Sequence, residues 1–181
     1  NLNLPSKKIL VQAVYKKESP DFRSVAKIAK QVLDFLSNDL PGVPYPYPVM
    51  TVFNSRIEGG GGMEFPMIVN DGSASSFAGT AGLTAHEIAH TYFPFLTGIN
   101  ERRYAWMDEG WATFLPYEFQ EKVGGINPRP RTVSSLVDTS IEYDLPLMIP
   151  SSIISGVAYR NNSYSKPATV YYILRDYLGD D

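Results

Sequence analysis

The two histidines of this chain lie four residues apart, at positions 86 and 90, within the stretch TAHEIAHTYF, and the sequence contains no others. On an α-helix, side chains at positions i and i+4 lie on one face about 6 Å apart along the axis, so two imidazoles can converge on one point. With Glu87 directly after His86, the pattern is H-E-x-x-H, which is typical of a zinc site. We therefore expect His86 and His90 to share a helix and to bind one zinc ion. The alternative is a solvated helix face with two chance histidines.

A third ligand must come from elsewhere, because a catalytic zinc keeps three protein ligands and leaves one position to water. Glu109 is the candidate, nineteen residues after His90 in WMDEGWATF, a stretch expected to begin a second helix. Two other acids compete for this role. Asp108 points about 100° away from Glu109 on a helix, so only one of the two can be a ligand. Glu101 lies in the charged loop NERRY, where a solvated acid is expected.

Four motifs of the chain resemble those of one peptidase family. AHEIAH is followed, with eighteen residues between, by the glutamate of WMDEGWATF. GGMEFP at positions 61–66 is similar to the strand motif G-[AG]-M-E-N and to a bacterial variant of it. SYSKPA places Tyr164 before Lys166, similar to a Y-x-K-[GA] context. Together these motifs resemble the catalytic domain of the aminopeptidase N family of gluzincin zinc peptidases, and the resemblance covers nearly all of the chain.

The resemblance implies a zinc-dependent aminopeptidase in which one ion is held by His86, His90 and Glu109. Glu87 is then the general base that takes a proton from the zinc-activated water and passes it to the leaving amine. Tyr164 is then the hydrogen-bond donor to the developing oxyanion. The chain has twelve tyrosines, and simple packing is the alternative for this one.

A substrate site is implied as well, and its expected partner is a peptide with a free N-terminus. Glu64 would pair with the α-amino group, which sets the distance from the N-terminus to the scissile bond. Glycines before it would let the substrate backbone approach closely, whereas a strand methionine is more often part of a core. The residues expected to line this site are Gly61, Gly62 and Met63. The preceding glycines, Gly59 and Gly60, are expected to form a flexible hairpin turn.

The chain also departs from the family pattern. Phe65 and Pro66 stand where the family usually has an asparagine after the glutamate, and Thr91 and Pro94 alter the stretch after the second histidine. These changes bear on substrate preference and leave the zinc ligands untouched. Family members carry a β-rich domain before the catalytic domain and a helical domain after it. Residues 1–181 are therefore expected to form a single catalytic domain, a fragment of a longer enzyme, with weak or no peptidase activity alone.

The expected fold class is α/β (α+β), a thermolysin-like domain with a small mixed sheet packed on a helical lobe. Extended segments are predicted at 7–15, 49–55 and 63–69. Helices are predicted at 19–40, 78–93, 104–123 and 166–178, with Ser19 as a cap and Pro116 dividing the third helix. The proline- and serine-rich stretches INPRPRTVSSLVDTS and LPLMIPSS are expected to be irregular.

Composition excludes several other classes of protein. The net charge is −3, and no Lys/Arg block is longer than a pair, so nucleic acid is not an expected partner. No apolar run approaches the roughly 20 residues of a membrane span, and the absence of cysteine leaves the compartment open. Two rival functions remain. A gluzincin endopeptidase would have no use for Glu64, and a non-catalytic peptide-binding module with a structural zinc would be marked by loss of Glu87 or Tyr164, both of which are present.

Overall fold

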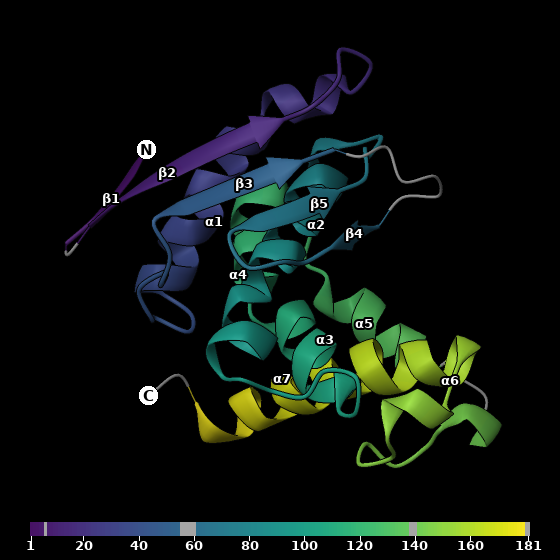
Figure 1. Cartoon of the computed structure of the whole chain (residues 1–181). Coiled ribbons are helices and arrows are strands. Elements are labelled where there is room, and N and C mark those ends of the chain that lie inside the picture. Colours follow the sequence, from purple (N-terminus) through teal and green to yellow (C-terminus); the bar gives the residue numbers. More distant parts are fainter. Residues whose placement is uncertain (6, 55–60, 138–140, 180–181) are drawn as a thin grey trace.

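The computed structural model describes residues 1–5, 7–54, 61–137 and 141–179. A mixed β-sheet with helices behind it makes up the upper part of the molecule in Figure 1, and a group of helices makes up the lower part. The expected small mixed sheet packed on a helical lobe is confirmed.

Five strands of the described chain form one sheet in the order β1-β2-β3-β5-β4. The central pairs β2–β3 and β3–β5 are parallel, and the outer strands β1 and β4 pair antiparallel with their neighbours. The predicted strand 63–69 is wrong in its extent, because its middle turns. Pro66 lacks an N–H for the ladder and Met67 has a positive φ of 69°. The strands are Leu2–Leu4 (β1), Lys7–Val14 (β2), Val49–Phe53 (β3), Gly62–Met63 (β4) and Ile68–Asp71 (β5).

Helices α1 (Val25–Asn38) and α2 (Phe77–Ala89) pack against the sheet, as Figure 1 shows. The buried residues of α1 recur every three or four positions, so the helix turns one apolar face to the core. The predicted start of this helix is wrong, because Pro20–Arg23 form a separate short helix, η1. Ser19 does not cap it, and its hydroxyl donates to Asn54 Oδ1 at 3.2 Å instead. The buried residues of α1 are Val25, Ile28, Ala29, Val32, Leu33, Phe35, Leu36 and Ser37.

The second half of the chain is a succession of helices. Pro116 separates α3 from α4, which confirms the predicted division of that helical stretch. The elements are η2 (Thr91–Leu96), α3 (Ala105–Phe114), α4 (Tyr117–Phe119), η3 (Gln120–Gly124), α5 (Arg129–Val137), η4 (Ile141–Tyr143), η5 (Ser151–Ile153), α6 (Gly156–Arg160), η6 (Asn161–Ser165) and α7 (Lys166–Leu178).

Helix α5 corrects one expectation, since its proline- and serine-rich sequence was expected to be irregular. Pro130 lies in the first turn, where the missing N–H costs no helical hydrogen bond. The tertiary structure also favours the helix. Arg129 forms an ion pair with Asp176 of α7, and its guanidinium lies 5.2 Å from the centre of the Tyr172 ring.

An aromatic stack joins α3 to α7 and positions the helices that carry the site. The centre of the Trp111 ring lies 4.1 Å from the centre of the Tyr171 ring and 4.9 Å from that of Phe93, and both of these rings are nearly parallel to it. Gly110 allows this close approach, because a Cβ at that position would lie 2.6 Å from the Cβ of Pro167. The two helices are therefore fixed to each other directly beside Glu109.

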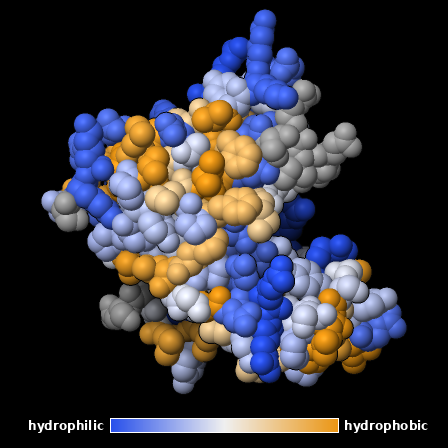
Figure 2. Space-filling view, viewed as in Figure 1, coloured by the Kyte–Doolittle hydropathy of each residue, from blue (hydrophilic) through white to orange (hydrophobic). Residues whose placement is uncertain are grey.

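The outer surface is mixed in character. In Figure 2, hydrophobic residues gather over the centre of the upper part of the molecule, and hydrophilic residues project at its top. The sheet contributes exposed apolar side chains, including Leu10, Val14 and Ile68. Among the described helices, none combines the length and the apolar character that a membrane crossing requires.

Candidate metal centre

Helix α2 carries His86, and His90 is the C-cap residue directly after it, so the two side chains lie on one face. Its first turn is capped by the Ser76 hydroxyl, which accepts a hydrogen bond from the Gly79 N–H at 3.1 Å. The opposite face of α2 is buried in the core, and this fixes how the helix is rotated. The Nε2 atoms of His86 and His90 lie 3.3 Å apart as a result, and their rings meet edge to face.

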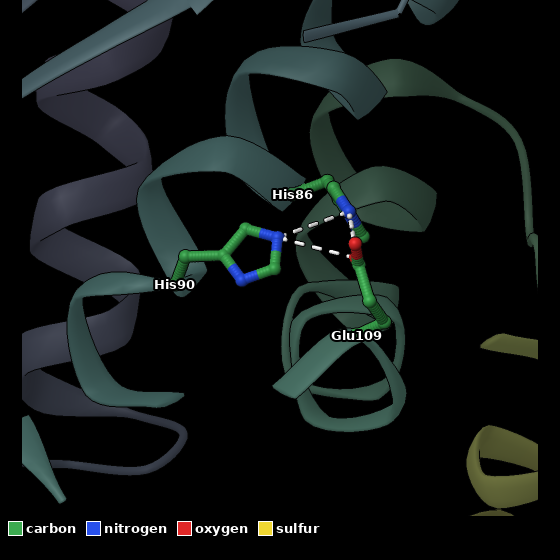
Figure 3. A group of neighbouring side chains, drawn as sticks. All are labelled: His86, His90 and Glu109. Carbon is green, nitrogen blue, oxygen red and sulfur yellow. Dashed lines mark hydrogen bonds and ion pairs between the residues drawn. The ribbon is translucent and has the colours of Figure 1, made fainter. Parts of the chain in front are cut away.

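Helix α3 brings Glu109 to the same point. Its Oε2 atom lies 3.1 Å from Nε2 of His86 and 3.3 Å from Nε2 of His90. Figure 3 shows the three side chains converging, with His86 projecting from α2, His90 from the end of that helix and Glu109 from the facing helix. Burial raises the pKa of Glu109, but hydrogen bonds from both imidazoles outweigh burial and hold this pKa below its usual range. Glu109 is therefore ionised.

The three donor atoms fit a zinc ion. Around a tetrahedral zinc with ligand distances of about 2.0–2.1 Å, neighbouring ligand atoms lie about 3.3 Å apart. The triangle formed by His86, His90 and Glu109 has sides of 3.1, 3.3 and 3.3 Å. Two imidazoles and one carboxylate are also the kind of ligand set that catalytic zinc takes. These residues could hold a single ion.

Asp108, weighed above as a competing ligand, contacts the second histidine from the other side. Its Oδ1 atom lies 2.6 Å from Nδ1 of His90, and the carbonyl oxygen of Phe93 lies 3.2 Å from the same nitrogen. Both groups accept a hydrogen bond from Nδ1–H, which leaves the lone pair of the imidazole on Nε2. Sequence reasoning missed this role, although the adjacency of Asp108 and Glu109 was a usable signal.

Glu87 lies beside the three donor atoms and is almost completely buried, with 4% of its surface exposed. Its Oε2 atom has no hydrogen-bond partner among the described residues. Burial raises the pKa of Glu87 to about 7, against the opposing influence of the two histidines. Gly62 of β4 packs directly on this side chain, since a Cβ there would lie 2.4 Å from Oε1. The absence of a side chain at Gly62 thus leaves room for the carboxylate of Glu87.

Tyr164 reaches the site from η6, directly before α7. Its hydroxyl donates a hydrogen bond to Oε1 of Glu109 at 2.5 Å, and its ring stacks on that of His86 with the centres 6.1 Å apart. Lys166 of the same motif points away from the site, donating to Asp144 Oδ1 at 2.6 Å and to the Leu145 carbonyl at 2.8 Å. The lysine therefore anchors the start of α7.

A cavity of about 510 Å³ is lined by the three donor residues, Glu87, Tyr164 and the predicted substrate residues. Glu64 follows strand β4 and is 9% exposed, while Met63 is 43% exposed and thus no core residue. Burial raises the pKa of Glu64. The hairpin expected at Gly59 and Gly60 lies outside the described residues. The predicted residues that line the cavity are Gly61, Gly62, Met63, Glu64, His86, Glu87, His90, Glu109 and Tyr164.

Four further cavity residues were not assigned to the site from sequence, and one of them, Leu83, is apolar. Tyr159 of α6 lies edge to face with Tyr164, and Arg102 lies on the cavity wall. Glu101 was expected to be a solvated acid, and this is wrong for its Oε2 atom, which is buried and has no hydrogen-bond partner among the described residues. Glu101 reaches the cavity from the turn between η2 and α3, and no motif of the sequence places this turn at the site.

Comparison with known proteins gives distant relatives. No family model matches the chain. It is 26% identical over 171 residues to the tricorn protease-interacting factor F2 of Thermoplasma acidophilum, and 26% identical over 170 residues to that of Thermoplasma volcanium. In both cases the match covers 84% of this chain, but this chain spans only 22% of the relative.

Solved structures share the fold. An M1 zinc metallopeptidase from Deinococcus radiodurans superposes with a TM-score of 0.69 at 16% identity, covering 99% of this chain and 39% of that one. A mutant of that enzyme bound to a Tyr-Ser-Ala substrate superposes with a TM-score of 0.70. The mixed sheet and the helical lobe match the catalytic-domain fold of these M1 peptidase structures, as expected. The chain is thus a distant sequence relative of the two F2 factors, and it has the fold of the M1 zinc metallopeptidase structures that it matches.

Proposed function

We propose that this chain is the catalytic domain of a zinc-dependent aminopeptidase, which hydrolyses the N-terminal peptide bond of a peptide. The observation that carries the proposal is the placement of Glu64, Glu87 and Tyr164 around the triangle of His86, His90 and Glu109 in one cavity. A zinc ion held by that triangle would supply Lewis acidity to a water molecule and to the scissile carbonyl group.

Glu87 is the proton carrier in this proposal. Its Oε2 atom is buried and has an acceptor position open, so it can take a proton from the attacking water. A pKa of about 7 suits a group that must both accept this proton and give it to the leaving amine. Close packing of Gly62 on Oε1 keeps the carboxylate from rotating away. The role of a general base at this position is worth roughly two to four orders of magnitude in rate.

Tyr164 is the proposed donor to the oxyanion. The hydrogen bond to Oε1 of Glu109 and the stacking on His86 hold the hydroxyl at the edge of the ligand triangle. Burial first, and then the negative charge of Glu109, raise the pKa of Tyr164, so the hydroxyl keeps its proton at any physiological pH. A rotation of the O–H bond redirects the proton from Glu109 to a negatively charged oxygen nearby.

Glu64 is the proposed anchor for the α-amino group of the substrate. It is buried beside the ligand triangle and is negatively charged when a cation is bound. The N-terminus of a peptide offers such a cation, its ammonium group. This anchor favours an aminopeptidase over an endopeptidase, because an internal peptide bond has no amine beside it.

The extent of the chain bears on its activity. The chain spans 22% of the length of its curated relatives and 39% of the length of the solved structures. The activity of those longer proteins is therefore only proposed for this chain. We propose that flanking domains enclose the cavity, and that this chain alone binds zinc while turning over peptides weakly.

The test combines metal analysis with hydrolysis of an aminoacyl p-nitroanilide. Wild type and Glu87→Gln are each expected to contain one zinc per chain, with hydrolysis lost only in the variant. An N-acetylated substrate serves as control and is expected to resist cleavage. Failure of the wild type to bind zinc would refute the proposal, and zinc binding without hydrolysis at any enzyme concentration would favour a non-catalytic module.

A further inference from the structure

Glu101 lines the cavity but belongs to none of the four motifs that resemble the family. It lies in the turn between η2 and α3 and forms a cluster with Glu64 and Asp108, in which one oxygen from each carboxylate lies within 4.8 Å of the other two. We propose that Glu101 binds the α-ammonium group of the substrate together with Glu64, as a second acidic contact supplied by this chain itself. The proposal rests on the aminopeptidase function proposed above and names a further residue that recognises its substrate.

The turn that carries Glu101 is held at several points. The backbone N–H of Glu101 donates to the Ile99 carbonyl at 3.0 Å. Beyond the turn, Ser151 fastens the start of α3, because its N–H donates to the Arg103 carbonyl at 3.0 Å and its Oγ accepts from the Ala105 N–H at 2.9 Å. The side chain of Glu101 is therefore presented to the cavity from a fixed backbone.

Two carboxylates of the cluster have acceptor positions open. Oε2 of Glu101 is buried without a hydrogen-bond partner in the described chain, and the carboxylate of Glu64, which is nine-tenths buried, accepts from its own backbone N–H and from no described side chain. Burial raises the pKa of both groups, as expected where the charged form lacks solvation. Asp108 differs, because its Oδ1 already accepts from Nδ1 of His90 at 2.6 Å. Glu101 and Glu64 can thus both accept hydrogen bonds from a bound cation.

An ammonium group fits this arrangement better than a second metal ion does. Its N–H bonds point to the corners of a tetrahedron, so acceptors at about 2.8 Å lie about 4.6 Å from one another, which the cluster allows. A metal ion held by this cluster would need Asp108 as a third ligand, in competition with His90. The cluster also borders the ligand triangle, since Asp108 precedes Glu109, and this is where the amine next to a scissile carbonyl must lie.

Calorimetric titration of the zinc-loaded chain with L-leucinamide, and with its desamino counterpart 4-methylpentanamide, tests the proposal. Glu101→Gln keeps the shape of the side chain and removes its charge. We expect this variant to bind leucinamide about ten- to a hundred-fold more weakly than wild type, since a hydrogen bond to a charged group is lost. Binding of 4-methylpentanamide is expected to stay unchanged. Glu18→Gln, which removes an exposed acid outside the cavity, is the matched control and should bind both ligands as wild type does.

Several results would overturn the assignment. Glu101→Gln could bind leucinamide as wild type does, or lose affinity equally for both ligands, or wild type could fail to bind leucinamide at all. Two metal ions per wild-type chain and one in Glu101→Gln would show instead that the cluster holds a metal. The aminopeptidase proposal is decided separately, by zinc content and by the Glu87→Gln comparison. It can therefore survive a negative result for Glu101.

Discussion

Asp108 and Glu109, consecutive residues of α3, contact the two nitrogens of the single imidazole of His90. Asp108 Oδ1 lies 2.6 Å from Nδ1, and Glu109 Oε2 lies 3.3 Å from Nε2. The angle of about 100° between neighbours on a helix separates the two carboxylates enough for the ring to fit between them. A carboxylate on Nδ1 fixes both the tautomer and the orientation of a metal-binding histidine and makes its other nitrogen more basic.

Removal of the Asp108 carboxylate is expected to weaken zinc binding. Asp108→Ala should lower the affinity about ten- to a hundred-fold, which is the usual effect of losing such an outer contact. Asp108→Asn should have a smaller effect, because its amide oxygen still accepts from Nδ1. Competition with a chromophoric chelator measures the affinity. Asp34→Ala, at an exposed position of α1, is the control, and equal affinities in Asp108→Ala and wild type would contradict the prediction.

Substitution of Gly62 is expected to displace the proton carrier without removing the metal. In Gly62→Ala the new Cβ would lie 2.4 Å from Oε1 of Glu87, closer than any real contact, so the carboxylate must move. We expect zinc content to be retained and hydrolysis to fall by about a hundred-fold, as when a general base is misplaced. Gly124→Ala is the control, because nothing lies within 3.8 Å of its Cβ. The idea fails if Gly62→Ala hydrolyses the substrate at the wild-type rate.

Loss of the Tyr164 hydroxyl is expected to lower kcat and leave binding nearly intact. Tyr164→Phe retains the ring that stacks on His86 and removes the donor, which at an oxyanion is worth about 10²–10³ in rate. Steady-state kinetics, with zinc content measured in parallel, separate this effect from loss of the metal. A rise in KM with unchanged kcat would assign Tyr164 to substrate binding instead.

Asp71 is expected to make the stability of the metal-free protein fall as the pH rises. It is 2% exposed, its Oδ2 accepts from the Thr84 hydroxyl at 2.7 Å, and burial raises its pKa to about 7. In the unfolded chain an aspartate titrates near pH 3.9. Between about pH 4 and pH 7 the folded state therefore binds more protons than the unfolded state, so the free energy of unfolding decreases across this range and levels off above it.

Asp71→Asn tests this, since the amide can still accept from Thr84 and carries no charge. At pH 8 the variant should be more stable than wild type by an amount on the order of a few kcal/mol, and at pH 4 the two should be nearly equal. Urea unfolding in the presence of a chelator measures both. A difference that is the same at pH 4 and pH 8 would show that Asp71 does not titrate as described.

The sequence predicted what depends on local periodicity. Helix α1 follows from its apolar stripe, and the convergence of His86 and His90 follows from helical spacing. Helix α5 could not be predicted in this way, because it packs on α7 and η6, which lie far along the chain; Arg129 and Asp176, which form an ion pair there, are forty-seven residues apart. The two-residue strand β4 could not be predicted either, because its extent depends on pairing with β5 and not on its own sequence.

For the site, the sequence identified the residues that motifs contain and missed those that belong to none. Glu101 comes from the turn before α3, which Ser151 fastens, and Tyr159 comes from α6. Asp108 was recognised as a possible ligand, but which nitrogen of His90 it contacts is decided by the packing of α3 against α2.

The contact between Gly110 and Pro167 links the metal centre to the C-terminal helix. Glu109 precedes the glycine, and Tyr164 lies three residues before the proline, so both functional groups sit next to one packing contact. If α7 detaches from α3 in a local opening, the tyrosine donor and the support behind the glutamate are lost in the same event. Amide hydrogen exchange in α7 should therefore slow when zinc binds, even though α7 supplies no ligand.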